Sequence, residues 1–184
     1  MHLGQFIQKP TFGMRNIKTA LTAAFCAMVY SFLGRSPAFA CIGVVFALGS
    51  DMGEAYRNGG NRLYGTLIGG LLGIVLFRIY LIFVPDGHHT PLLALFTFLG
   101  TILLIGLCQA FWVGGVQPGG VVLCILLFNT PVDSYVSYAL NRIFDTAVGV
   151  VLGLAVCWVF PRDWRLIWRE RLARLKAGKA NTAE

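Results

Sequence analysis

The sequence predicts an all-α membrane protein with six transmembrane helices, built as a 3+3 inverted repeat and followed by a C-terminal amphipathic helix in the membrane interface. Of its 184 residues, 57% are hydrophobic and 12% are charged, which is about half the charged share of an ordinary globular domain. The mean hydropathy of +0.71 agrees with this prediction. In addition, the segment NRLYGTLIGGLLG from Asn61 returns as NRIFDTAVGVVLG from Asn141.

Six apolar segments are candidates for membrane helices, since such a helix needs about 20 mostly apolar residues. The second and fifth are short. The first is expected to remain as an uncleaved helix, because Phe39 does not suit a signal-peptide cleavage box and the apolar run continues past it. Pro161 ends the sixth segment. The six segments cover residues 16–33, 37–49, 62–83, 92–111, 119–128 and 142–160.

Basic residues near the helix ends predict the orientation. Lys9, Arg15 and Lys18 lie at the start of the first segment, and Arg57 and Arg62 lie between the second and third. Lys and Arg are concentrated on the cytoplasmic side of membrane proteins. These regions and the basic C-terminal tail share one side only if both termini are cytoplasmic. We therefore expect an integral protein of a bacterial cytoplasmic (inner) membrane with six crossings.

The expected domain organisation is one transmembrane domain, residues 1–160, with repeat halves at about 13–84 and 92–160, and a basic tail at 161–184. The net charge is +7, and seven of the fifteen basic residues fall in the last 23 positions. Apolar residues recur in the tail at helical spacing, which predicts a helix lying in the membrane interface. Nucleic-acid binding is the alternative for such a tail, but no recognition fold accompanies it, so we expect no nucleic-acid partner.

The repeat predicts two halves of opposite orientation. The match extends backward, because Pro37 opens the second segment and Pro118 opens the fifth at almost the same distance from the Asn-Arg pair. The repeated unit therefore has three helices. A second copy of an odd number of helices enters the membrane from the other side. Secondary transporters often show this arrangement, with their sites near the midplane between the repeats.

Each copy places the same residue types on one helix face, because the spacing i, i+4, i+7, i+11 forms a single stripe. Glycines in the stripe, with Gly65 beside it, predict close helix packing, and we expect the third and sixth helices to cross there. The stripes are Arg62, Thr66, Gly69 and Gly73 in the first copy and Arg142, Thr146, Gly149 and Gly153 in the second.

The arginines of the stripe have two interpretations. Arginine near lipid costs about 2.5–3.5 kcal/mol at the bilayer centre, so Arg62 and Arg142 either extend to the headgroups or bind an anion. A guanidinium group can bind a carboxylate with two parallel hydrogen bonds. Arg78, farther along the third segment, is interpreted as an interfacial anchor. Lys18 either extends to the cytoplasmic surface or lines an inner vestibule.

Asp145 breaks the repeat, because Gly65 occupies the matching position. Its i, i+3 spacing from Arg142 predicts a salt bridge between the two, and the alternative is a proton carrier. The stretches SDMGEAYRNGG and NTPVDSY follow the two short segments. They are either ordinary polar loops or helix ends that face a water-filled cavity inside the membrane.

The remaining reactive residues predict no catalytic centre. The five cysteines lie in apolar runs without a CxxC pair, so neither a disulfide nor a metal site is expected. His88 and His89 lie in the polar turn PDGHHTP. The apolar helices contain no Ser/His or paired-carboxylate arrangement, and we expect no enzyme and no cofactor. The absence of a GxxxxGK[ST] motif indicates that this chain does not use ATP.

Three motifs in order resemble the fusaric acid resistance and aromatic acid exporter family, whose relatives include the plant aluminium-activated malate transporters. They are GxRxxKT from Gly13, RxxGTxxG from Arg62 and NRxxDTxxG from Asn141, and the resemblance covers about residues 10–160. It implies a six-helix membrane unit, often dimeric, that moves organic anions outward. The motif positions that it implies for the transport path are Arg15, Lys18, Arg62, Thr66, Arg142, Asp145 and Thr146.

The leading functional hypothesis is therefore a secondary, gradient-driven exporter of small organic anions, aromatic carboxylates among them. A passive anion channel would use the same residues. A non-transporting membrane accessory subunit is the third hypothesis, and the small size of the chain favours it. Many family members carry a further cytoplasmic domain or a second set of six helices, so we expect this chain to form a homodimer or other homo-oligomer, or to need a partner subunit.

Overall fold

The structure is a computed structural model that describes residues 14–87 and 90–160, and every regular element in these ranges is helical. The all-α prediction is confirmed there. The tail expected to form an interfacial helix, and the two histidines of the polar turn, lie outside the described residues. In order, the elements are α1 (Met14–Phe32), α2 (Ala38–Ala47), α3 (Met52–Phe83), α4 (Pro91–Phe111), the 3₁₀ helix η2 (Val113–Gly115), α5 (Val116–Asn129) and α6 (Tyr135–Val159).

Three of the described helices, α3, α4 and α6, are long and apolar enough to cross a membrane. This agrees with the prediction of an integral membrane protein. The short segments also appear as expected, since α2 has 10 residues and α5 has 14. At about 1.5 Å per residue they reach about 15 and 21 Å, well short of a hydrocarbon core of about 30 Å. The helix α1, with 19 residues, is not among these three.

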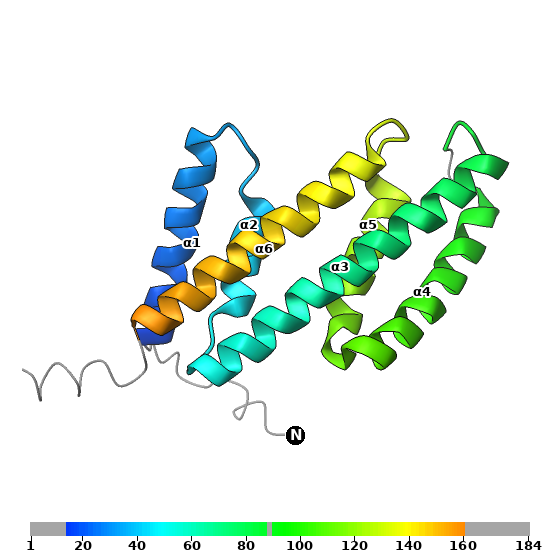
Figure 1. The fold of residues 1–184 in the computed structure, drawn as a ribbon. Helices are drawn as coiled ribbons and strands as arrows, with labels where there is room; N and C mark the ends of the chain where they lie inside the picture. The colour runs from blue at the N-terminus through cyan, green and yellow to red at the C-terminus, as the bar shows by residue number, and fades with distance from the viewer. Residues whose placement is uncertain (1–13, 88–89, 161–184) are drawn as a thin grey trace, which may run out of the picture.

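The centre of the fold is the pair α3 and α6, which lie side by side and run in opposite directions (Figure 1). On one side α2 packs against α6, with α1 outside it. On the other side α5 packs against α3, with α4 outside it. Two apolar cores follow from this arrangement. One gathers around α5 and includes Leu76, Leu104 and Leu123; the other gathers around α2 and includes Tyr30, Val44 and Cys157.

Both central helices begin earlier than the apolar pattern predicts. The side chain of Asp51 caps α3 by accepting a hydrogen bond from the backbone N–H of Glu54 at 2.8 Å, and the carboxylate of Glu54 accepts the backbone N–H of Ser50 at 2.6 Å. These caps satisfy backbone donors that a helix start leaves unpaired. Arg62 is therefore the eleventh residue of α3, and Arg142 the eighth of α6. The expectation that the third helix begins at Arg62 is wrong, because it begins at Met52.

The glycine stripes face the short helices. A Cβ atom at Gly69 would lie 2.7 Å from the Cα of Gly119 in α5, and one at Gly149 would lie 3.0 Å from the Cα of Gly43 in α2. The helices therefore approach at backbone distance, as small residues permit in membranes. The expected crossing of α3 and α6 at these glycines is wrong. Other stripe glycines contact the same partner helices, namely Gly65, Gly73 and Gly153.

Candidate functional site

Two cavities begin at the repeated Asn-Arg pairs. The first, about 560 Å³, is lined by Asn61 and Arg62 of α3 together with the end of α2 and the start of α5. The second, about 410 Å³, is lined by Asn141 and Arg142 of α6 and by the α1–α2 connection. We call them the Arg62 cavity and the Arg142 cavity. The helices α3 and α6 are antiparallel (Figure 1), and each pair lies in the first half of its helix. The two cavities therefore lie toward opposite ends of the central pair.

Arg62 is a buried cation without a carboxylate partner among the described residues. It is 7% exposed, and its Nε atom has no hydrogen-bond partner. Its guanidinium carbon lies 5.4 Å from the ring centroid of Phe46, near the end of α2. Burying a charge without an opposite charge is unfavourable. The Arg62 cavity therefore provides a place where a small anion would be stabilised.

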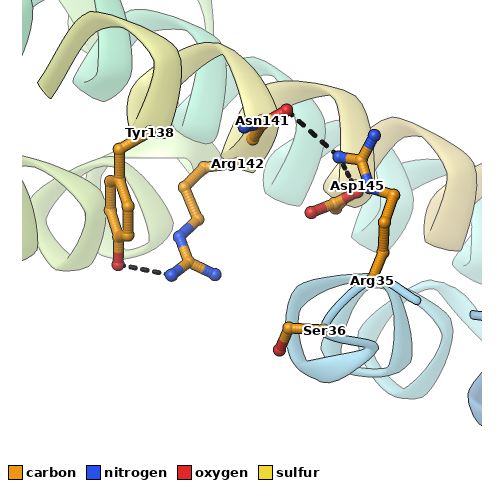
Figure 2. Close-up of a pocket in the computed structure, with 6 residues that line it drawn as sticks. All are labelled: Arg35, Ser36, Tyr138, Asn141, Arg142 and Asp145. Carbon is orange, nitrogen blue, oxygen red and sulfur yellow. Dashed lines mark hydrogen bonds and ion pairs between the residues drawn. The ribbon is translucent and has the colours of Figure 1, made fainter. Parts of the chain in front are cut away.

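Arg142 lies between two aromatic rings. Its guanidinium carbon is 3.1 Å from the ring centroid of Phe39 in α2 and 4.1 Å from that of Tyr138, so both rings stabilise the cation through their π faces. It also donates to the hydroxyl of Tyr138, while its buried Nε has no partner (Figure 2). This arginine too has an unpaired donor, and the residue lines the Arg142 cavity.

The predicted salt bridge between Arg142 and Asp145 is wrong. The carboxylate of Asp145 accepts instead from Arg35 at 3.1 Å and from the hydroxyl of Tyr30 at 3.1 Å. Arg35 belongs to the α1–α2 connection and extends toward α6 (Figure 2). The sequence analysis did not select Arg35 or Tyr30 as site residues. The sequence signal that Tyr30 and Arg35 lie near each other is Gly34, directly after α1. A glycine in this position commonly ends a helix and brings the following residue near the last turn.

Each repeated asparagine accepts a hydrogen bond from the other half of the chain. Asn141 accepts from Arg35 at 3.1 Å, and Asn61 accepts from the indole Nε1 of Trp112 at 2.7 Å. Arg35 follows α1, and Trp112 follows α4, so the two donors have corresponding places. Trp112 also stacks on Tyr64 at 4.7 Å between centroids. The asparagines thus fix the helix segments that carry the two arginines.

Thr66 and Thr146 are fully buried, and their hydroxyls have no hydrogen-bond partner. Each lies one turn after its arginine, on the same helix face. A buried hydroxyl left unpaired costs about 1–3 kcal/mol. Four other helix threonines donate to the backbone carbonyl four residues earlier, which is the usual solution. They are Thr19, Thr22, Thr97 and Thr101.

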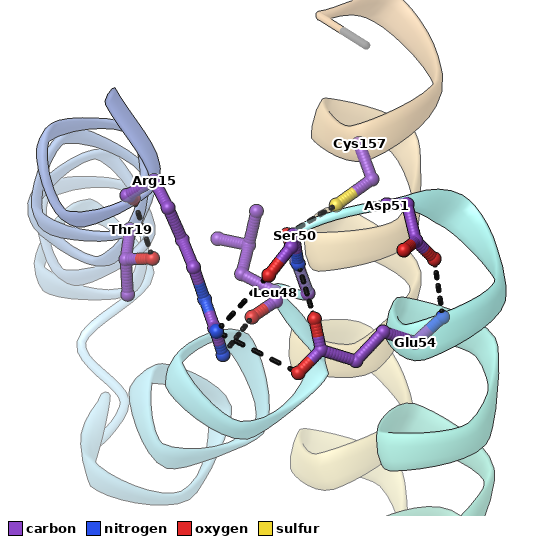
Figure 3. Close-up of polar contacts among 8 residues, drawn as sticks. Arg15, Thr19, Leu48, Ser50, Asp51, Glu54 and Cys157 are labelled. Atoms are coloured by element: carbon purple, nitrogen blue, oxygen red, sulfur yellow. Dashed lines mark hydrogen bonds and ion pairs between the residues drawn. The ribbon is translucent and has the colours of Figure 1, made fainter. Parts of the chain in front are cut away.

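The two basic residues predicted in α1 have different positions. Arg15 reaches the α2–α3 connection, where it donates to the carbonyl of Leu48 at 3.2 Å and pairs with Glu54 at 3.6 Å (Figure 3). It also lines the Arg62 cavity. Lys18 donates to the carbonyl of Phe160, after the end of α6, and lines a separate apolar groove between α1 and α6. The structure therefore brings Arg15 to Arg62 and leaves Lys18 apart from both cavities.

Over residues 14–87 and 90–160, no three His, Cys, Asp or Glu side chains lie where they could hold a metal ion together. The five cysteines are free thiols. The groups that the cavities do offer are guanidinium, amide and hydroxyl donors beside aromatic rings, together with the carboxylate of Asp145, which is paired with Arg35. This set of groups suits recognition of an organic anion.

A comparison with protein families matches residues 11–160 to the description Aromatic acid exporter family member 1. The match includes both cavities and 150 of the 184 residues. The chain belongs to the aromatic acid exporter family. The resemblance predicted from the three motifs is thereby confirmed, and membership supports the prediction of a membrane transport protein. Searches of curated proteins and of solved structures each found no match.

Proposed function

We propose that this member of the aromatic acid exporter family carries small aromatic carboxylates out across the membrane by a secondary, gradient-driven mechanism. The observation that carries the proposal is Arg62, a buried guanidinium that lines a cavity of about 560 Å³ and has no acidic partner among residues 14–87 and 90–160. A carboxylate would supply the missing charge and accept the free N–H donors. The corresponding residue of the second copy, Arg142, provides a second site of the same chemistry.

The helix α2 connects the two sites. Phe46 faces Arg62 and Phe39 faces Arg142, and their spacing of seven positions corresponds to about 10 Å along a helix. The ring of an aromatic acid can contact these phenyl groups while its carboxylate contacts the guanidinium beside them. Substrate would thus move from one arginine to the other along one face of α2.

We propose six membrane crossings in a 3+3 inverted repeat as the framework for this movement. The antiparallel α3 and α6 support it, as do the matched contacts of α3 with α5 and of α6 with α2 (Figure 1). The start of α1 and the end of α6 lie at the same end of the molecule (Figure 1), which supports placing both on one side of the membrane, and the basic residues near both termini support the cytoplasmic side of an inner membrane. Both cavities are partly open, and we propose that a second copy in a homodimer or other homo-oligomer completes their walls.

Substitution of the two arginines tests the transport proposal. Each of Arg62→Gln and Arg142→Gln removes a charge-assisted hydrogen bond worth about 1.5–3 kcal/mol, so we expect efflux at low substrate concentration to fall about 10- to 100-fold. The measurement is efflux of radiolabelled benzoate and terephthalate from proteoliposomes, after subtraction of protein-free vesicles. Arg78→Gln is the control, because Arg78 is an exposed arginine of α3, the helix that also carries Arg62, and it lies outside both cavities.

Several outcomes would contradict the proposal. Undiminished flux in Arg142→Gln would remove Arg142 from the mechanism, and an equal loss in Arg78→Gln would show that the effect is unspecific. Current steps too large for a carrier in planar bilayers would establish a passive anion channel. Absence of flux in the wild type, together with purification as a complex with another membrane protein, would establish an accessory subunit.

A further inference from the structure

Both members of an ion pair, Arg35 and Asp145, line the Arg142 cavity, whereas of the pair formed by Arg15 and Glu54 only the arginine lines the Arg62 cavity. The Oδ1 atom of Asp145 accepts from both Tyr30 and Arg35, and no described side chain donates to its other oxygen. The side chain of Asp145 is 9% exposed, whereas that of Arg35 is 41% exposed. The carboxylate is thus held within the cavity wall, and the guanidinium that pairs with it is accessible from the cavity.

The end of α1 brings the two donors together. Gly34 has a φ of +64°, its N–H donates to the carbonyl of Ser31, and the N–H of Arg35 donates to the carbonyl of Tyr30 at 3.1 Å. This pair of bonds is the Schellman cap, for which glycine is strongly favoured. Nothing lies within 4 Å of a Cβ atom built at Gly34. The backbone of Arg35 is therefore fixed, while the connection that carries it is not enclosed by neighbouring side chains.

The other half of the molecule folds without such an ion pair. Gly65 takes the place of Asp145, and a Cβ atom there would already lie 2.5 Å from the ring of Pro118. The corresponding asparagine, Asn61, is held by the neutral indole of Trp112 rather than by an arginine. Packing of the repeated helix therefore does not require an acid at this position. The ion pair of Arg35 and Asp145 is a feature of one cavity and not of the fold.

We propose that Asp145 substitutes for the substrate carboxylate in the empty protein, and that Arg35 exchanges Asp145 for the substrate when the Arg142 cavity is occupied. This inference rests on the proposed transport function. Two carboxylates within one cavity repel each other strongly where water is scarce, so they compete for Arg35. In the empty protein the pair neutralises Arg35, which would otherwise remain as an uncompensated cation while the carrier returns.

The variant Asp145→Asn tests the exchange, because it keeps the size of the side chain and removes its charge. Without the competing carboxylate of Asp145, we expect the KM for terephthalate to fall about three- to fivefold, which corresponds to the strength of a partly exposed ion pair. Net efflux at saturation should also fall, since the empty carrier returns with an unpaired Arg35. One-for-one exchange of labelled for unlabelled terephthalate should stay at the wild-type rate, since it involves only loaded carriers.

Arg35→Gln supplies the complementary measurement. It removes the group that binds substrate, so its KM should rise, and the double variant of Arg35→Gln and Asp145→Asn should have the KM of Arg35→Gln alone. Asp86→Asn is the matched control, because it removes an exposed carboxylate from the α3–α4 turn and should change none of the three quantities. If Asp145→Asn does not accumulate in membranes, an unchanged KM in Arg35→Gln is sufficient to overturn the inference.

A purely structural ion pair would give a different pattern. Both single variants would then lower net efflux and exchange to the same extent, with lower thermal stability and with the KM of Asp145→Asn unchanged or raised. That result overturns the exchange while leaving transport intact. Absence of terephthalate and benzoate flux in the wild type would instead overturn the proposed function, so the two failures are distinguishable.

Discussion

At the scale of single residues, three side chains of the repeated motif have different roles. The asparagine accepts a donor from the other half of the chain, the arginine presents a guanidinium to a cavity, and the threonine one turn later keeps its hydroxyl unpaired. The identity and spacing of these residues could be predicted from the sequence because a helix places i and i+4 on one face. The partners could not, because Arg35 and Trp112 come from connections whose course depends on tertiary packing.

The unpaired hydroxyls give a prediction that separates a binding role from a stabilising one. Thr66→Val removes a buried hydroxyl without a partner and keeps the shape of the side chain. We expect a free energy of unfolding that is equal to the wild-type value or higher by up to about 1–3 kcal/mol, together with slower terephthalate efflux. Thermal melting in detergent and proteoliposome flux are the two measurements.

Thr97→Val is the control for this substitution, since the hydroxyl of Thr97 already donates to the carbonyl of Leu93 at 2.8 Å. It should not raise the melting temperature and should leave efflux unchanged. Clear destabilisation by Thr66→Val would mean that the Thr66 hydroxyl has a bound partner such as an ordered water, and would contradict its assignment as a free group.

At the scale of elements, the short helices α2 and α5 explain why the glycine stripes exist. Each short helix lies against the stripe of the long helix from the other half, at backbone distance. The early start of α3 carried a readable signal, because Asp51 followed by Glu54 at the third position is a helix-capping pattern. The pair Gly59 and Gly60 is typical of a loop, which argued against a helix over the same residues. Both glycines instead make room for neighbours, Val150 and Trp112.

At the same scale, the contacts between helices predict which glycines tolerate an added methyl group. A Cβ atom at Gly149 would lie against the backbone of α2, including the Cα of Gly43 at 3.0 Å. Since backbone cannot move aside easily, we expect Gly149→Ala to lower the free energy of unfolding by about 1–3 kcal/mol. The measurement is thermal melting in detergent, with the yield of monodisperse protein as a second readout.

Gly106→Ala is the matched control within α4, because nothing lies within 4 Å of a Cβ atom at that position. Alanine should there be neutral or stabilising by about 0.5–1 kcal/mol, as expected for replacement of glycine inside a helix. Equal melting temperatures for Gly149→Ala and the wild type would show that the approach of α2 to α6 is looser than the structure indicates.

At the scale of the whole molecule, the direction of α3 relative to α6 decides whether the two copies of the repeated segment can have opposite orientations. The two helices run in opposite directions, and the α3–α4 and α5–α6 turns lie at one end of the molecule, with the α2–α3 connection at the other (Figure 1). The two arginine cavities consequently lie toward opposite ends. The proposed export path would therefore run from one end of the molecule to the other.

The whole-molecule prediction concerns sidedness. Single cysteines at the exposed positions Ser50, Asp86 and Ser134 can be labelled in intact cells with a membrane-impermeant maleimide, in a background without the native cysteines. For six crossings with cytoplasmic termini, we expect Asp86→Cys and Ser134→Cys to react from outside and Ser50→Cys to react only after the membrane is permeabilised. The parent without cysteines is the control. Labelling of Asp86→Cys and Ser134→Cys from different sides would refute the inverted repeat.

The sequence by itself determined the helical class, the short second and fifth helices, and the family. These properties are local or periodic, since hydropathy, helical spacing and motif order depend only on the order of residues along the chain. Tertiary structure alone decided that Asp145 pairs with Arg35 rather than with Arg142, and that the glycines contact α2 and α5 rather than each other. The physical reason is that both depend on which segments distant in sequence meet, and spacing along one helix carries no information about the neighbour across it.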